Sequence, residues 1–223
     1  MRKSTFVVAV LVAVAVVGAG ALFASNMGFK LNYNLAATGD AVPGGTSAAG
    51  NNSLALPYNR QAGIDTAQDL IDDVTASGGG VFDVSQFVES TDSFNTYSGA
   101  KSQTNFNLVA GEAVFIRMST GVDYIVVGSH DPGLTVPLEA TGAGSAAGNN
   151  FFSVPYHTTA ADAQDLINSI GAGSVFDVSQ FLEATDSFDT FSGAKSQTPF
   201  TLVPGEGVFV RMSSTVNHVP SHF

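Results

Sequence analysis

The chain has 223 residues, with 19 acidic and 8 basic side chains, a formal net charge of -11, and neither cysteine nor tryptophan. A surface this negative argues against binding to nucleic acid or to anionic lipid headgroups. Because there is no cysteine, neither a disulfide nor a lipid anchor on cysteine can stabilise or tether the chain, and its fold must rest on apolar cores and turns.

Residues 1–25 have the pattern of a secretory signal peptide. Arg2 and Lys3 precede an uncharged apolar run from Phe6 to about Val17, and small residues follow at Ala19-Gly20-Ala21. We expect cleavage after Ala21 or near Ser25. The alternative is an uncleaved anchor, because the apolar run can be extended to Phe23 and approaches the ~20 residues that span a bilayer. The pattern predicts export to the periplasm, the cell surface or the medium.

Most of the remaining chain is written twice. The stretch "VFDVSQFVESTDSFNTYSGAKSQTNFNLVAGEAVFIRMS" (81–119) returns as "VFDVSQFLEATDSFDTFSGAKSQTPFTLVPGEGVFVRMS" (175–213), with 30 identities in 39 positions. Upstream, "GNNSLALPYN" (50–59) matches "GNNFFSVPYH" (148–157), and "LAATG" (35–39) matches "LEATG" (138–142). The offset between copies changes only at Gly and Ser positions, as loop deletions would produce. We predict two tandem modules, residues 26–128 and 129–223, with the boundary near Gly128 to Gly133.

Each copy is predicted to be α+β, a small and mostly antiparallel sheet with one short helix. "SLALPY" and "FFSVPY" indicate strands that a proline ends, which is typical of a sheet edge. Thr66 and Asp162 stand at helix N-cap positions, and apolar residues follow at i, i+3, i+4 and i+7 in both copies. Gly78 and Gly171 are expected to end these helices.

A hairpin and a second turn follow each helix. "FDVSQFLEATDSFDTFSG" predicts two strands around a polar turn at Thr185-Asp186-Ser187, with Phe181, Phe188 and Phe191 as packing residues. "FTLVPGEGVFVRMS" predicts a strand, a type II turn and another strand, with positive φ at Gly205 and at its counterpart Gly111.

This order of motifs resembles a loosely defined group of repeated β-rich modules in secreted and cell-surface proteins of bacteria and archaea. In that group a "GWN" start and a "PGEGYWV"-like end bracket each unit; here the corresponding signals are "GNN" and "PGEGVFVRM". Asn51 and Asn149 take the usual tryptophan position, and Phe115 and Phe209 stand near the other. The resemblance covers residues 28–223 and implies an extracellular module, usually without catalytic activity.

Histidine gives little support for catalysis or metal binding. The chain has four histidines and no G-x-S-x-G motif, so a nucleophile with its base is not indicated. His157 and His218 are not repeated, whereas His130 and His222 recur in Ser-His pairs. One histidine per unit lacks the partners of a metal site, and a polar loop residue is the favoured interpretation.

Acidic residues recur at the hairpin turn of both copies and are the candidate metal ligands. They are Glu89, Asp92 and Asn95 in the first copy and Glu183, Asp186 and Asp189 in the second. Closely spaced oxygen ligands could hold calcium, but tight turns select the same residue types, and the turn interpretation is favoured. Carboxylate pairs for glycoside hydrolysis would occur twice, where an enzyme needs one pair.

Aromatic and glycine-rich stretches have simpler interpretations. Tyr58, Tyr97, Tyr124 and Tyr156 could stack on sugars, but aromatic residues at strand spacing are predicted to fill the core. The glycines of "ASGGG" and "GAGS" lack the strand, helix and lysine context of a phosphate loop.

These patterns predict an exported, non-enzymatic structural or adhesive protein without a cofactor, calcium being the single candidate. Its partners would be further copies of itself or components of the cell envelope, with membrane contact only through an uncleaved N-terminal segment. The alternative is a soluble extracellular protein that binds glycan or calcium, with one site per module.

Overall fold

The structure is a computed structural model that describes residues 29–56, 59–60, 63–129, 133–156 and 158–220. The predicted signal peptide lies outside these residues. The described chain is β-rich, with 46% strand and 10% helix in two helices. Every pairing between named strands is antiparallel. The predicted β-rich, antiparallel architecture is therefore confirmed.

The first half of the chain, defined here as residues 29–129, contains two sheets that share one core. It also contains a separate two-stranded hairpin. Strands β4 (Asn51–Ala55), β8 (Ala113–Thr120), β6 (Gly80–Val88) and β7 (Ser93–Tyr97) form a sheet in the order β4-β8-β6-β7. Strands β1 (Phe29–Leu35), β9 (Val122–Ser129) and β5 (Asn59–Arg60) form a sheet in the order β1-β9-β5. Among the residues that the structure describes, strands β2 (Ala41–Val42) and β3 (Gly45–Thr46) pair with each other alone, and the helix is α2 (Ala67–Ala76).

The second half, residues 133–220, has the same main sheet. Strands β11 (Asn149–Ser153), β14 (Gly207–Met212), β12 (Val175–Leu182) and β13 (Ser187–Phe191) follow in the order β11-β14-β12-β13. Strand β10 (Val136–Leu138) pairs with β15 (Val216–His218), and the helix is α3 (Ala163–Ile170). Strand β10 thus completes a sheet of its own half.

Both helices begin and end where the sequence predicts. The Thr66 side chain accepts a hydrogen bond from the backbone N–H of Asp69, and the Asp69 side chain accepts one from the Thr66 backbone, which forms a capping box. In α3, Asp162 accepts the backbone N–H of Asp165 at 2.9 Å. Positive φ angles at Gly78 (100°) and Gly171 (124°) end the two helices.

One predicted strand in each copy is wrong. The residues before the second turn, 106–109 and 200–203, form only an isolated bridge, Thr66 to Asn107 and Asp162 to Thr201. Their backbone bonds go instead to the segment that enters the helix: Ala163 N–H donates to Phe200 O, and Leu202 N–H to Ala161 O. Leu108 and Leu202 are buried there, so the apolar residues anchor the helix entrance.

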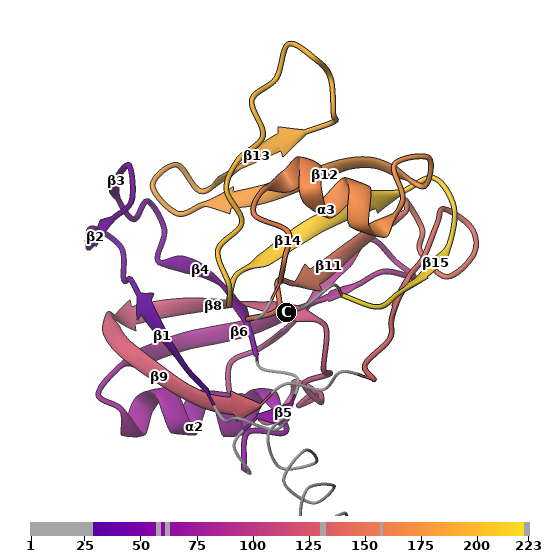
Figure 1. The fold of residues 1–223 in the computed structure, drawn as a ribbon. Coiled ribbons are helices and arrows are strands. Elements are labelled where there is room, and N and C mark those ends of the chain that lie inside the picture. Colours follow the sequence, from indigo (N-terminus) through magenta and orange to yellow (C-terminus); the bar gives the residue numbers. More distant parts are fainter. Residues whose placement is uncertain (1–28, 57–58, 61–62, 130–132, 157, 221–223) are drawn as a thin grey trace, which may run out of the picture.

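Each main sheet packs against different elements on its two faces. The outer face of the first sheet packs on α2 and on β1 and β9 around Leu70, Val84 and Ile116. The outer face of the second packs on α3 and on β10 and β15 around Leu166, Val178 and Val210. Figure 1 shows the second sheet above the first, with α2 on the side of the first sheet away from the second. The inner faces of the two sheets therefore meet in the middle of the molecule.

The predicted positive φ angles are confirmed at Gly111 (89°) and Gly205 (93°). The N–H of Glu206 donates to Val203 O at 3.1 Å, and that of Glu112 donates to Val109 O at 3.3 Å, which closes each turn. A Cβ added at Gly205 would lie 2.9 Å from the Tyr33 ring, and one at Gly111 would lie 2.6 Å from Val136 Cγ2. Each turn therefore requires its glycine for two reasons: the backbone has a positive φ, and the other half of the chain lies too close for a side chain.

Gly205→Val is expected to lower the free energy of unfolding by about 1 kcal/mol or more, because valine tolerates neither the positive φ nor the contact with Tyr33. Gly111→Val should have an effect of the same sign. Pro204→Ala is the matched control and should be mild, since Ala110 already occupies the equivalent position. Urea denaturation measures all three; a Gly205→Val protein as stable as wild type would contradict the turn assignment.

Candidate functional site

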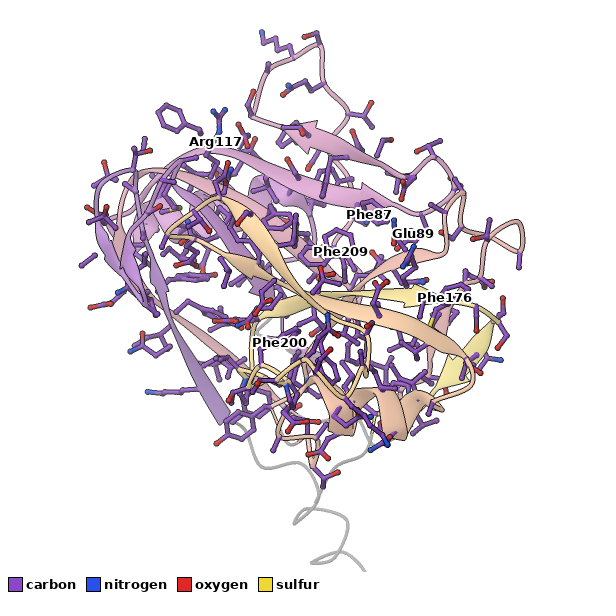
Figure 2. The ribbon with its side chains drawn as sticks, turned by 90° about the horizontal axis from the view of Figure 1, so that it is seen from above. Phe87, Glu89, Arg117, Phe176, Phe200 and Phe209 are labelled. Carbon is purple, nitrogen blue, oxygen red and sulfur yellow. The ribbon has the colours of Figure 1, made fainter. Side chains whose placement is uncertain are left out.

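An aromatic cluster joins the inner faces of the two sheets. Its buried core is Ala55, Phe87, Ala113 and Phe151, and Phe115 and Phe209 pack against it. Phe151 is stacked between Phe115 (ring centroids 4.8 Å apart) and Phe209 (4.5 Å), with interplanar angles of 14° and 13°. Phe87 meets the Phe209 ring edge-on at 4.9 Å, and Figure 2 shows these two rings together between the ribbons of the two halves. This cluster belongs to neither half alone.

Backbone hydrogen bonds cross the junction in equivalent pairs. Ala48 N–H donates to Glu183 O (3.0 Å), and its counterpart Ala146 N–H donates to Glu89 O (2.7 Å). Ala55 N–H donates to Gly205 O (2.8 Å), and Ser153 N–H donates to Gly111 O (3.0 Å). Because each contact has a counterpart with the halves exchanged, the junction has the reciprocal character of a two-fold interface.

The repeated "GNN" motif has a structural role in both copies. Its second asparagine is buried: Asn52 accepts Ala36 N–H and donates to Ala36 O, and Asn150 does the same with the backbone of Glu139. Its first asparagine reaches across the junction: Asn51 Nδ2 donates to Asp186 Oδ1, and Asn149 Nδ2 donates to Asp92 Oδ1, both at 2.9 Å.

The exchange symmetry of the junction breaks at two pairs of equivalent positions. Position 53 is serine, and its hydroxyl contacts the N–H (2.8 Å) and the C=O (3.1 Å) of Gly207. The equivalent position is Phe151, the central ring of the cluster. Ala113 corresponds to Gly207, and a Cβ added at Gly207 would lie 2.3 Å from Ala113 Cβ. The two copies therefore differ in a way that fits them to each other.

Two grooves of equal size flank the aromatic cluster, each about 370 Å³. One is lined by Asn51, Ser85, Phe94, Thr96, Phe115, Phe181, Asp186 and Phe188. The other is lined by the equivalent residues Asn149, Ser179, Phe188, Thr190, Phe209, Phe87, Asp92 and Phe94. Each groove thus takes residues from both halves, and Phe94 and Phe188 line both grooves.

The six candidate calcium ligands are not gathered into sites. Asp92 and Asp186 lie in the hairpin turns, where each has a φ of 50°, and each accepts an asparagine of the other half. Asn95 and Asp189 follow Phe94 and Phe188 in the strand and so face away from the inner side. Within the described residues no group of three or more histidine, cysteine, aspartate or glutamate side chains could hold a metal ion. Calcium binding stays a prediction.

Each half contains a pair of half-buried carboxyl groups. Glu89 belongs to the pair in the first half, and Glu183 belongs to the pair in the second. Burial raises the pKa of Glu89 and Glu112 above the usual glutamate value, and the negative charge of Glu112 raises that of Glu89 further. Burial, followed by the charge of Glu206, raises the pKa of Glu183 to about 7. Gln86 and Gln180 donate hydrogen bonds to Glu112 and Glu206 at 3.1 and 3.3 Å. These pairs could not be predicted from local sequence patterns, because their members lie 23 residues apart in each copy.

The raised pKa of Glu183 predicts a fall in stability with rising pH. The unfolded carboxyl loses its proton near 4.5, and the folded one loses it near 7, so the folded state binds more protons between these values. This stabilisation is complete below about pH 4.5 and is lost as the pH rises through 7. Urea denaturation of wild type and Glu183→Gln at pH 5 and 7.5 tests it: the stability difference should shift in favour of the variant at pH 7.5. A difference that stays constant with pH would contradict the prediction.

The structure describes one of the four histidines and three of the four tyrosines considered as candidate site residues. His130, His157, His222 and Tyr58 lie outside the described residues. His218 is buried beside Phe152, and burial lowers its pKa to about 4. Tyr97 and Tyr124 are buried as predicted, and the Tyr124 hydroxyl donates to Asp73 at 2.7 Å. The core prediction is wrong for Tyr156, which is 42% exposed and stacks on Phe29 with ring centroids 4.2 Å apart.

The described residues define a β-rich protein in which two equivalent sheets pack through a shared aromatic cluster. Comparison with known proteins adds no family: no protein-family model, curated protein or solved structure matches this chain. Among the described residues, no helix has both the length and the apolar character needed to cross a membrane.

Proposed function

We propose that this chain is an exported, non-enzymatic surface protein with a structural or adhesive role, built from two homologous modules, residues 26–128 and 129–223. The observation that carries the proposal is the reciprocal junction. The repeated polar residues Asn51, Asn149, Asp92 and Asp186 form hydrogen bonds across it. The duplicated chemistry is therefore used to join two copies, as in a symmetric dimer whose subunits are fused.

The repeated carboxyl pairs are consistent with the same role. Glu89 with Glu112 and Glu183 with Glu206 occur once in each half, and glutamine holds one member of each pair. A surface protein gains from duplication because two equivalent faces can engage partners at once. The partners would be further copies of the chain or components of the cell envelope.

Fractionation of the producing cells, with intact-mass measurement of the recovered protein, tests the proposal. We expect the protein in the envelope or medium, lacking its first 21–25 residues. Molecules that retain Met1 and lie in the envelope would make the N-terminal segment an anchor. Recovery of the full-length chain from the cytoplasm would contradict export and with it the surface role.

Ligand binding is the second candidate, and the two grooves favour it. A volume near 370 Å³ lies within the range of about 300–1,000 Å³ that is typical of small-molecule sites. The one-site-per-module form of this candidate needs revision, because each groove is formed by both halves.

A further inference from the structure

We propose that the two grooves beside the aromatic cluster bind a neutral polysaccharide chain. The inference rests on the proposed surface function, because a location outside the cell gives access to such polymers. It starts from Phe94 and Phe188, which lie on the edge strands β7 and β13 and are 46% and 47% exposed. Their neighbours in the cluster, Phe87 and Phe151, are 6% and 3% exposed. Half-exposed aromatic rings that line a groove offer apolar surface on which a sugar ring can pack.

The polar groups of the grooves suit a ligand that is rich in hydroxyl groups. Ser85 Oγ and Thr96 Oγ1 lie 2.8 Å apart, as do Ser179 Oγ and Thr190 Oγ1. Such a pair uses one hydroxyl hydrogen for its own bond and keeps a second hydrogen and several lone pairs for a ligand. Asp186 and Asp92, oriented by Asn51 and Asn149, add carboxylate acceptors at the rim. Each groove thus combines apolar faces with donors and acceptors, the composition expected for sugar rings.

The charge of the grooves selects a neutral polymer over an anionic one. Each lining includes one aspartate and no lysine or arginine, and the chain carries a net charge of -11. A polymer with carboxylate or sulfate groups would be repelled. Because both grooves are lined by Phe94 and Phe188, they adjoin at these two rings, and we expect one extended chain to occupy both.

Affinity electrophoresis of the purified mature protein tests this inference independently of its location in the cell. The probes are gels with soluble xylan, mannan or mixed-linkage β-glucan, with polygalacturonate as the anionic comparison. We expect at least one neutral polymer to retard the protein. Phe94→Leu with Phe188→Leu should weaken that retardation about tenfold, because leucine fills the space but has no flat face.

The matched control is Phe82→Leu with Phe176→Leu, which changes two exposed phenylalanines (53% and 54%) outside both grooves and should leave retardation unchanged. Thr96→Val with Thr190→Val preserves shape, removes one hydroxyl per groove and should also weaken binding; thermal melting verifies folding of every variant. The inference is overturned if no neutral polymer retards the protein or if polygalacturonate alone does. The inference is also overturned if the polymers retard the groove variants and wild type equally. It is overturned as well if the groove variants lose self-association and keep their binding to the polymer. Failure here with normal export would leave the surface role intact.

Discussion

Phe151→Ala is expected to lower the free energy of unfolding by about 3–5 kcal/mol, the usual cost of deleting a buried phenylalanine ring. The ring is 3% exposed and lies between Phe115 and Phe209 with centroid distances of 4.8 and 4.5 Å. Its removal would open a cavity between two stacked partners that belong to different halves. Urea denaturation measures the loss.

Phe176→Ala is the control for this measurement. Phe176 is 54% exposed, and the guanidinium of Arg211 lies 5.3 Å from its ring centroid. Its loss should cost about 1 kcal/mol or less. Equal effects of the two substitutions would show that the aromatic cluster contributes little to stability.

Gly207→Ala is expected to destabilise the protein by about 1–3 kcal/mol through overpacking. In a strand, alanine is normally more favourable than glycine by about 0.5–1 kcal/mol, so the expected sign is the reverse of the usual one. The cause is contact: the new Cβ would lie 2.3 Å from Ala113 Cβ and 2.7 Å from Phe151 Cε2.

The double variant Gly207→Ala with Ala113→Gly identifies the source of that cost. Moving the methyl group from one half to the other relieves the contact with Ala113 and leaves the contact with Phe151. Stability should therefore recover in part, with a coupling energy of about 0.5 kcal/mol or more in the double-mutant cycle. Additive effects would show that positions 113 and 207 do not meet.

Local features of the fold could be predicted from sequence because they depend on nearby residues. Caps at Thr66 and Asp162, turns that require Gly111 and Gly205, and strands that end before a proline all follow from short-range geometry. The strands expected at 106–109 and 200–203 failed for a tertiary reason: their backbone groups bond to the segments that precede the helices.

The candidate site could not be predicted because it is made between the copies. The local sequence around Phe94 and Phe188 does not distinguish them from buried aromatic residues in strands. It therefore does not show that they border a groove. The acidic turn residues suggested calcium, whereas Asp92 and Asp186 accept asparagine side chains 57 and 135 residues away. A usable signal was the mismatch between copies at Ser53 and Phe151 and at Ala113 and Gly207. Compensating differences of this kind indicate that the two copies pack against each other.

The unfolding of residues 129–223, expressed alone, tests most directly whether the chain consists of two modules. All the strand pairings of β10 to β15 lie within this segment, and its core around Leu166, Val178 and Val210 is its own. Without the first half, the inner face with Phe151 and Phe209 is exposed, so self-association of the fragment is expected. We expect a cooperative thermal transition by circular dichroism; a chain that stays unfolded would contradict the two-module architecture.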